Sequence, residues 1–170
     1  MASPFELLGL PVTFNLDTSN IDSALRAAGL KWHPDRFACA PVAEREHAEE
    51  QMAEFNVAHA CLSNPLQRAI ALLEVFACPY DPSGVNADPE FLMEMLEMKE
   101  ELAMAKDGDD STALSKLIFD LRQREKRELM QLSQLFSTWE SDQNRSQDLP
   151  KLQQLLNQLH YLARTIETSY

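Results

Sequence analysis

Apolar residues recur every three or four positions along most of the chain, which is the spacing of one face of an α-helix. β-branched residues are scarce and nowhere alternate with polar ones over five or more positions, so the pattern predicts no strand. The apolar stripes predict an all-α protein. Its helices are expected at about residues 4–8, 18–32, 41–63, 65–76, 89–106, 111–139 and 150–166.

Capping residues and prolines set the ends of these helices. Pro34 ends the second helix, because the residue before a proline is pushed out of the α conformation. Gly9 ends the first helix, since glycine is favoured directly after a helix. Side chains that can accept a hydrogen bond from the first turn stand at the predicted starts: Ser3, Asp17 or Thr18, Asn64, Asp88 and Ser111.

The segment 77–88 separates two groups of predicted helices. It contains Pro79 and Pro82, and its composition is typical of a linker. We therefore expect a first domain over residues 1–76, a hinge over 77–88, and a second domain over 89–170. Short loops join the last three helices, which predicts an antiparallel three-helix bundle for the second domain.

Charge and composition narrow the function classes. With 15 basic and 27 acidic residues the net charge is −12, so nucleic-acid partners are disfavoured. The chain has only four glycines and neither of the Gly-rich motifs that hold nucleotide phosphates, and no cofactor is expected. No apolar run reaches the roughly 18 residues of a membrane span, and no basic leader begins the chain. Three widely spaced cysteines suit a reducing compartment, so we expect a cytoplasmic protein with no membrane partner.

The tripeptide His33-Pro34-Asp35 lies in the turn between two predicted amphipathic helices. Pro34 fixes the turn and so lowers the entropy that a partner's binding would cost. Asp35 offers a carboxylate that a partner's arginine can grip with two hydrogen bonds. Residues 24–37 form a locally basic patch, with three basic groups and one acid, and the basic residues are Arg26, Lys31 and Arg36. The turn and its patch are therefore predicted to dock a protein.

The fifth helix has two apolar faces when its residues are placed at 100° intervals. Four residues lie within about 40° of one line and are expected to pack into the bundle: Phe91, Met95, Met98 and Leu102. A second group lies roughly 100–200° away: Leu92, Met93 and Leu96, beside Glu97, Glu100 and Met104. A bundle helix needs only one buried stripe, so the second face predicts a protein-binding surface. Segment 88–110 has nine acidic and two basic residues, a net charge of −7 that favours a basic partner.

Four segments carry a resemblance to a known family: PFELLGLP near the start, LKWHPDRFA, NVAHACLSNPLQRAIALLE, and FLMEMLEMKEEL at residues 91–102. Over residues 1–76 the sequence resembles J-domain co-chaperones. Over nearly the whole chain it resembles the HscB family. Ordinary J-proteins continue into a Gly/Phe-rich linker and CxxCxGxG zinc repeats, and this chain has neither.

The resemblance implies a function that regulates another protein. A J-domain of this kind stimulates the ATPase of the DnaK-type chaperone HscA, and the second domain delivers the iron–sulfur cluster scaffold IscU to it. By resemblance the chaperone-binding residues are His33, Pro34, Asp35, Arg26, Lys31 and Arg36. The matching scaffold-binding positions are Leu92, Met93, Leu96, Glu97, Glu100 and Met104. The chain itself is then expected to be no enzyme and to hold no metal.

Four positions depart from this expectation or leave it open. Gly29 lies inside the second helix, where glycine costs roughly 0.5–1 kcal/mol relative to alanine. Relatives often carry an aromatic residue after the Lys-Leu of the last helix, whereas this chain has Gln153 and Gln154. The contribution of that helix to scaffold binding is therefore open. Leu92 could instead pack on the first domain or the hinge.

Three other functions compete with this one. A general J-protein would serve DnaK and unfolded clients, a purely structural bundle would carry the tripeptide by accident, and an enzyme would need a cryptic site. The histidines offer no metal site, because His47 and His59 lie about 18 Å apart along one helix. His160 stands alone in the sequence. Structural or exposed roles are expected for all three histidines.

Overall fold

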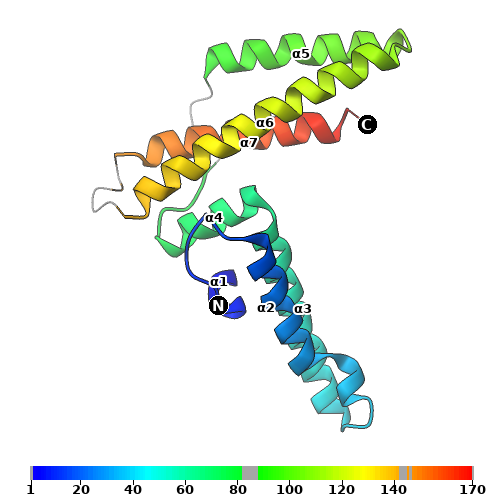
Figure 1. The fold of residues 1–170 in the computed structure, drawn as a ribbon, viewed down its shortest axis with the longest axis vertical. Coiled ribbons are helices and arrows are strands. Elements are labelled where there is room, and N and C mark those ends of the chain that lie inside the picture. The colour runs from blue at the N-terminus through cyan, green and yellow to red at the C-terminus, as the bar shows by residue number, and fades with distance from the viewer. Residues whose placement is uncertain (1, 82–87, 142–144, 146, 170) are drawn as a thin grey trace. The chain divides into compact units, whose positions relative to one another are not determined.

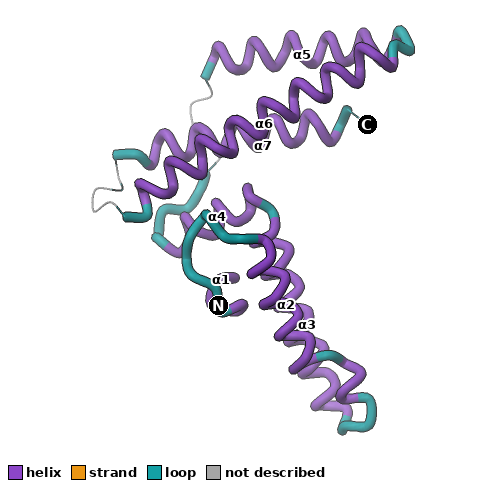
Figure 2. Tube along the Cα trace, viewed as in Figure 1, coloured by secondary structure: helices purple, strands orange, loops and turns teal. Residues whose placement is uncertain are grey.

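The computed structural model describes residues 2–81, 88–141, 145 and 147–169, and all regular structure within these ranges is helical (Figure 1 and Figure 2). This confirms the all-α prediction. The chain divides into two compact units, a first unit of Met1–Pro79 and a second unit of Tyr80–Tyr170. The division falls inside the expected hinge, of which residues 82–87 lie outside the described part of the chain.

The first unit is built around one long helix. Its elements are α1 (Pro4–Leu8), α2 (Thr18–Trp32), a short 3-10 helix η1 (Pro34–Phe37), α3 (Val42–Ser63) and α4 (Pro65–Val75). Helix α3 contacts all four of the other elements, and α2 and α3 lie side by side as a hairpin (Figure 1). The sequence pattern did not predict η1, which turns the loop after Pro34 into a defined single turn.

The helix starts follow the capping chemistry of the sequence, with one exception. Ser3 and Glu6 form a reciprocal capping box, with the Glu6 amide 3.2 Å from Ser3 Oγ. Asp17, and not Thr18, caps α2. The predicted cap Ser111 is wrong, because Asp110 Oδ1 accepts hydrogen bonds from the Thr112 and Ala113 amides. Ser111 is instead the first helical residue.

A buried arginine holds the first unit together. Arg68 of α4 is 6% exposed, and its Nη1 donates to the backbone carbonyls of Phe14 at 2.9 Å and Leu16 at 3.3 Å. The guanidinium also lies 5.5 Å from the centre of the Phe14 ring. These bonds satisfy carbonyl groups of the loop between α1 and α2, where the chain has no helical partner for them.

The second unit is a three-helix bundle of α5 (Pro89–Asp107), α6 (Ser111–Trp139) and α7 (Leu149–Glu167). Helix α6 packs against both of the others. All three helices contribute to one core cluster, which contains Phe91, Met95, Leu102, Leu121, Leu162 and Ile166, with Met98 packed against it. The predicted inward face of the fifth helix is therefore confirmed.

Contacts from both neighbours fix the rotation of α5 about its own axis. From α6, Arg124 Nη2 lies 2.8 Å from Glu94 Oε2, and its guanidinium lies 5.0 Å from the Phe91 ring centre. From α7, the Tyr161 ring packs edge-on to Phe91, with 6.0 Å between the ring centres. Lys99 Nζ donates to the Tyr161 hydroxyl at 2.9 Å. A helix clamped on two sides presents a defined third face outward.

Candidate protein-docking surfaces

The His33-Pro34-Asp35 turn is exposed and internally ordered. His33 ends α2 in an extended conformation, and Pro34 begins η1. The Asp35 amide donates to His33 Nδ1 at 3.3 Å, and Asp35 Oδ2 lies 3.6 Å from the same nitrogen. The His33 side chain is 55% exposed and that of Asp35 is 91% exposed. The imidazole edge at Nε2 and the carboxylate are therefore available to a partner.

Aromatic packing attaches this turn to the helical hairpin. The Trp32 ring stacks on Phe37 of η1, with ring centres 6.3 Å apart and planes 11° apart. The edge contact between Trp32 and His47 of α3, at 5.4 Å, joins the same cluster to the opposite helix. His47 thus has a structural role. The turn is presented on a fixed support, so little entropy is lost when a partner binds it.

The three predicted basic residues surround the turn and are all exposed. Lys31 Nζ lies 5.0 Å from the centre of the Trp32 ring. Arg26 donates to Ser23 Oγ at 3.4 Å, and Arg36 Nη1 donates to the backbone carbonyl of Leu30. Because their few bonds are to neutral groups, these cations keep their charge available for an acidic partner.

An apolar recess that sequence reasoning missed lies beside the turn. It is lined by Leu25, Arg26, Gly29, Leu30, His33, Arg36 and Met52. Leu30 is 76% exposed at this recess. Gly29 adds no side chain, and no heavy atom lies within 4 Å of the place its Cβ would take. The candidate docking surface of the first unit is therefore partly apolar and partly cationic.

The predicted outward face of α5 is exposed, as the helical geometry indicated. Leu92 is 40% exposed, Met93 66%, Leu96 57% and Met104 74%. Glu97 and Glu100 are exposed beside them. Four large apolar side chains on one exposed helix face, beside carboxylates, have the character of a protein-binding surface. Their exposure follows from the clamped orientation of α5.

Of the two glutamines of the last helix whose contribution the sequence left open, only Gln154 lines a hollow beside Leu92. Gln153 is half-buried. Gln154 lines a small hollow between α5 and α7 that also contains Leu92, Asn157 and Tyr161. Leu92 therefore borders a hollow whose α7 wall carries the amide groups of Gln154 and Asn157 and the aromatic phenol of Tyr161.

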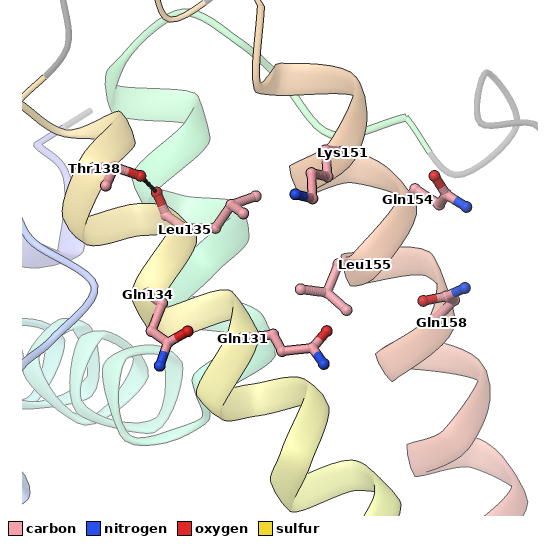
Figure 3. Close-up of a pocket in the computed structure, with 8 residues that line it drawn as sticks. All are labelled: Gln131, Gln134, Leu135, Thr138, Lys151, Gln154, Leu155 and Gln158. Carbon is pink, nitrogen blue, oxygen red and sulfur yellow. Dashed lines mark hydrogen bonds between the residues drawn. The ribbon is translucent and has the colours of Figure 1, made fainter.

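Gln154 also lines a second groove, between α6 and α7, which Figure 3 shows from the open side. Its walls carry Gln131, Gln134, Thr138, Lys151 and Gln158, with Leu135 and Leu155 between them. Glutamine amides, a threonine hydroxyl and the Lys151 ammonium group make this groove able to donate and accept hydrogen bonds.

Within the described ranges, no group of three His, Cys, Asp or Glu side chains could hold a metal ion. His59 Nε2 lies 2.8 Å from Asp22 Oδ1 and joins α3 to α2, which is a structural role. Cys61 is half-buried, and burial raises the pKa of its thiol. No described helix is both long enough and apolar enough to span a bilayer.

Comparison with known proteins places these features in a family context. Residues 87–168 match the family described as the HSCB C-terminal oligomerisation domain. An HscB co-chaperone homologue of Neisseria meningitidis serogroup B is 32% identical over 150 residues, which cover 84% of this chain and 86% of the relative. A homologue of Paraburkholderia phymatum is 35% identical over 137 residues, covering 80% of this chain and 78% of the relative.

Solved structures agree with the fold. The chaperone HscB of Vibrio cholerae superposes with a TM-score of 0.80 at 30% identity, covering 99% of this chain and 95% of that one. Human co-chaperone HscB superposes with a TM-score of 0.85 at 21% identity, covering 99% and 81%, and shows the shared fold. With a J-domain hairpin, a C-terminal helical bundle and these relatives, the chain belongs to the HscB co-chaperone family.

Proposed function

We propose that this chain stimulates the ATPase of an HscA-type chaperone and delivers an IscU-type iron–sulfur scaffold to it in the cytoplasm. One observation carries the proposal: two exposed docking surfaces of different chemistry lie on two separate compact units. The first has an aspartate carboxylate beside cations, and the second is apolar and acidic. A protein that brings two others together needs two such surfaces. It does not need a catalytic group of its own.

The first surface suits a chaperone ATPase domain. We assign this role to residues 1–76, with His33, Pro34 and Asp35 at its centre. The Asp35 carboxylate can receive an arginine of the chaperone in a bidentate pair, while Arg26, Lys31 and Arg36 attract acidic groups around it. The pre-formed turn then holds the chaperone in a hydrolysis-competent state by binding that state more tightly than the other.

The second surface suits a scaffold protein. We assign it to residues 89–170, with Leu92, Met93 and Leu96 as the apolar centre. Glu97 and Glu100 lie beside that centre, and Met104 extends it along α5. Methionine side chains adapt to a partner's shape, and the carboxylates favour a basic rim on that partner.

The test is a His33→Gln variant in an ATPase assay with the HscA-type chaperone, and in parallel with a general DnaK. Stimulation of HscA should be lost. Because His33 is exposed and its contacts lie within the turn, the free energy of unfolding should change by no more than about 0.5 kcal/mol.

A His160→Gln variant is the matched control, since His160 is an exposed histidine in the second unit. It should stimulate the chaperone as the parent does. Full stimulation by the His33 variant would count against the proposal. A parent protein that stimulates DnaK and not HscA would indicate a general J-protein.

A further inference from the structure

A polar groove runs between α5 and α7 in the second unit, and basic side chains dominate it. Its charged or titratable lining residues are Lys99, His160 and Arg164, and Asn157 and Tyr161 add neutral donors. Among the residues the structure describes, no aspartate or glutamate lines this groove. This is unexpected in a chain of net charge −12.

One cation of the groove, Lys99, is held in place by a neutral group. Lys99 Nζ donates to the Tyr161 hydroxyl at 2.9 Å and lies 4.4 Å from the centre of that ring. About two turns after Lys99 on α5, Lys106 Nζ donates to the Thr168 carbonyl at 2.9 Å. None of the ion pairs found among the described residues involves Lys99, His160 or Arg164. Within the described part of the chain, the charges of Lys99 and Arg164 are therefore not neutralised by an ion pair.

The groove continues into the exposed apolar face of α5. The hollow beside Leu92 and the cationic groove share Asn157 and Tyr161 as lining residues, so the two are contiguous. At 100° per residue, Lys99 lies about 20° from Leu92 around the helix axis. Glu97 lies about 160° from Lys99 on the same helix. The apolar surface thus has a positive edge on one side and a negative edge on the other.

We propose that the groove of Lys99 and Arg164 binds a carboxylate side chain of the protein that docks on Leu92, Met93 and Leu96. This inference rests on the proposed function and adds the orientation in which the partner binds. An arginine fork and a lysine can share one carboxylate, with the phenol and amide of the groove as further donors. A partner with an acid at this position and basic groups over Glu97 is held in one orientation, since the reversed one opposes like charges.

Charge reversal distinguishes this local contact from long-range attraction. We would measure the affinity of the full chain for an IscU-type scaffold by calorimetric titration, for the parent, Arg164→Glu and Lys116→Glu. Lys116 is exposed on α6, outside both helices of the groove, and gives the same change in net charge. Thermal melts of all three proteins check that the fold is kept.

The proposal predicts opposite results for the two variants. Arg164→Glu should weaken scaffold binding by about tenfold, because a carboxylate then faces a carboxylate. Lys116→Glu should leave the affinity within about twofold of the parent or raise it, since added negative charge attracts a partner drawn to an acidic protein. An Arg164→Glu variant that binds as well as Lys116→Glu, or better, would overturn the inference.

A Leu96→Ser variant separates the inference from the proposed function. If the parent binds the scaffold and Leu96→Ser weakens binding, the assignment of the docking surface is supported. The result for Arg164→Glu then tests the role of the groove alone. If the parent does not bind the scaffold at all, both the docking partner and the inference are wrong.

Discussion

At the scale of single residues, two buried charged side chains show how this fold uses polar groups. Arg68 satisfies loop carbonyls in the first unit. Glu128 of α6 is 8% exposed, and its Oε1 accepts a hydrogen bond from Arg124 Nε at 3.1 Å. Its Oε2 has no hydrogen-bond partner in the described part of the chain. Burial raises the pKa of the Glu128 carboxyl, although Arg124 acts in the opposite direction.

This geometry predicts that Glu128→Gln stabilises the protein at neutral pH. A carboxyl whose pKa is higher in the folded state favours folding when it is protonated, and loses that contribution as the pH rises through the folded-state pKa. Above that pKa the glutamine variant should be more stable by ~1 kcal/mol, because it carries no buried charge. Arg124 keeps its contact to Glu94 at 2.8 Å. Urea unfolding at pH 4 and pH 7.5 measures the difference.

The sign of the pH dependence tests the mechanism. The advantage of Glu128→Gln should shrink as the pH falls toward 4.5, the ordinary value for glutamate. Asp120→Asn removes an exposed carboxylate from the same helix and is the matched control for the change of charge. A Glu128→Gln variant that is less stable than the parent at pH 7.5 would show that its ion pair with Arg124 outweighs the cost of burial.

At the scale of the element, α5 has one buried face and one exposed apolar face. Met95 is fully buried and Met98 packs against the core, whereas Leu92 and Leu96 are exposed. Such a helix must satisfy two requirements at once. One face must fill the bundle, and the other must stay apolar without aggregating, for which the surrounding carboxylates are suited.

Replacing Leu92 and Leu96 together with serine should weaken scaffold binding by about two to four powers of ten. Each leucine buried at an interface contributes roughly 1.5–3 kcal/mol, and 1.4 kcal/mol is tenfold in affinity. The melting temperature should change little, since both side chains already face solvent. Chaperone stimulation in the absence of scaffold should persist.

Replacing Met95 and Met98 with serine is the matched control, and it should behave in the opposite way. Removing buried methionine side chains costs about 2–5 kcal/mol each when the cavity cannot close. Calorimetric titration and a thermal melt on both double variants measure the two effects. If the leucine pair unfolds the protein and the methionine pair does not, the two faces have been assigned the wrong way round.

At the scale of the whole molecule, each unit has its own fully buried side chains. In the first unit these include Phe5, Ile21 and Leu72, and in the second Met95, Leu121 and Leu162. Separate cores permit separate folding. Two functions can then be carried by one chain without one surface constraining the packing of the other.

Residues 1–79 expressed alone should therefore fold. Circular dichroism should show helix and a cooperative thermal transition, because the fragment retains the α2–α3 hairpin and the Arg68 contacts. The fragment should stimulate the chaperone weakly and should not bind the scaffold. An unfolded fragment would show that the first unit depends on the second for its stability.

The local features of this protein could be predicted from the residue pattern alone. Helix positions, the caps at Ser3, Asn64 and Asp88, and the two faces of α5 all depend on residues within four positions of one another. The turn at Pro34 also depends on nearby residues, because a proline between two amphipathic helices indicates a turn. Helical geometry is periodic, so the residues that share one face of a helix can be recognised from their spacing in the sequence.

The hydrogen bonds between polar groups far apart in the sequence became known from the packing of the helices. Arg68 binds a carbonyl 54 positions away, and Lys99 binds a hydroxyl 62 positions away. No spacing in the sequence marks such pairs, because the chain between them can pack in many ways until the whole core is formed. The burial of Glu128 depended likewise on how α6 packs. The cationic groove, made from an acidic helix and a distant one, therefore had no signal in the sequence.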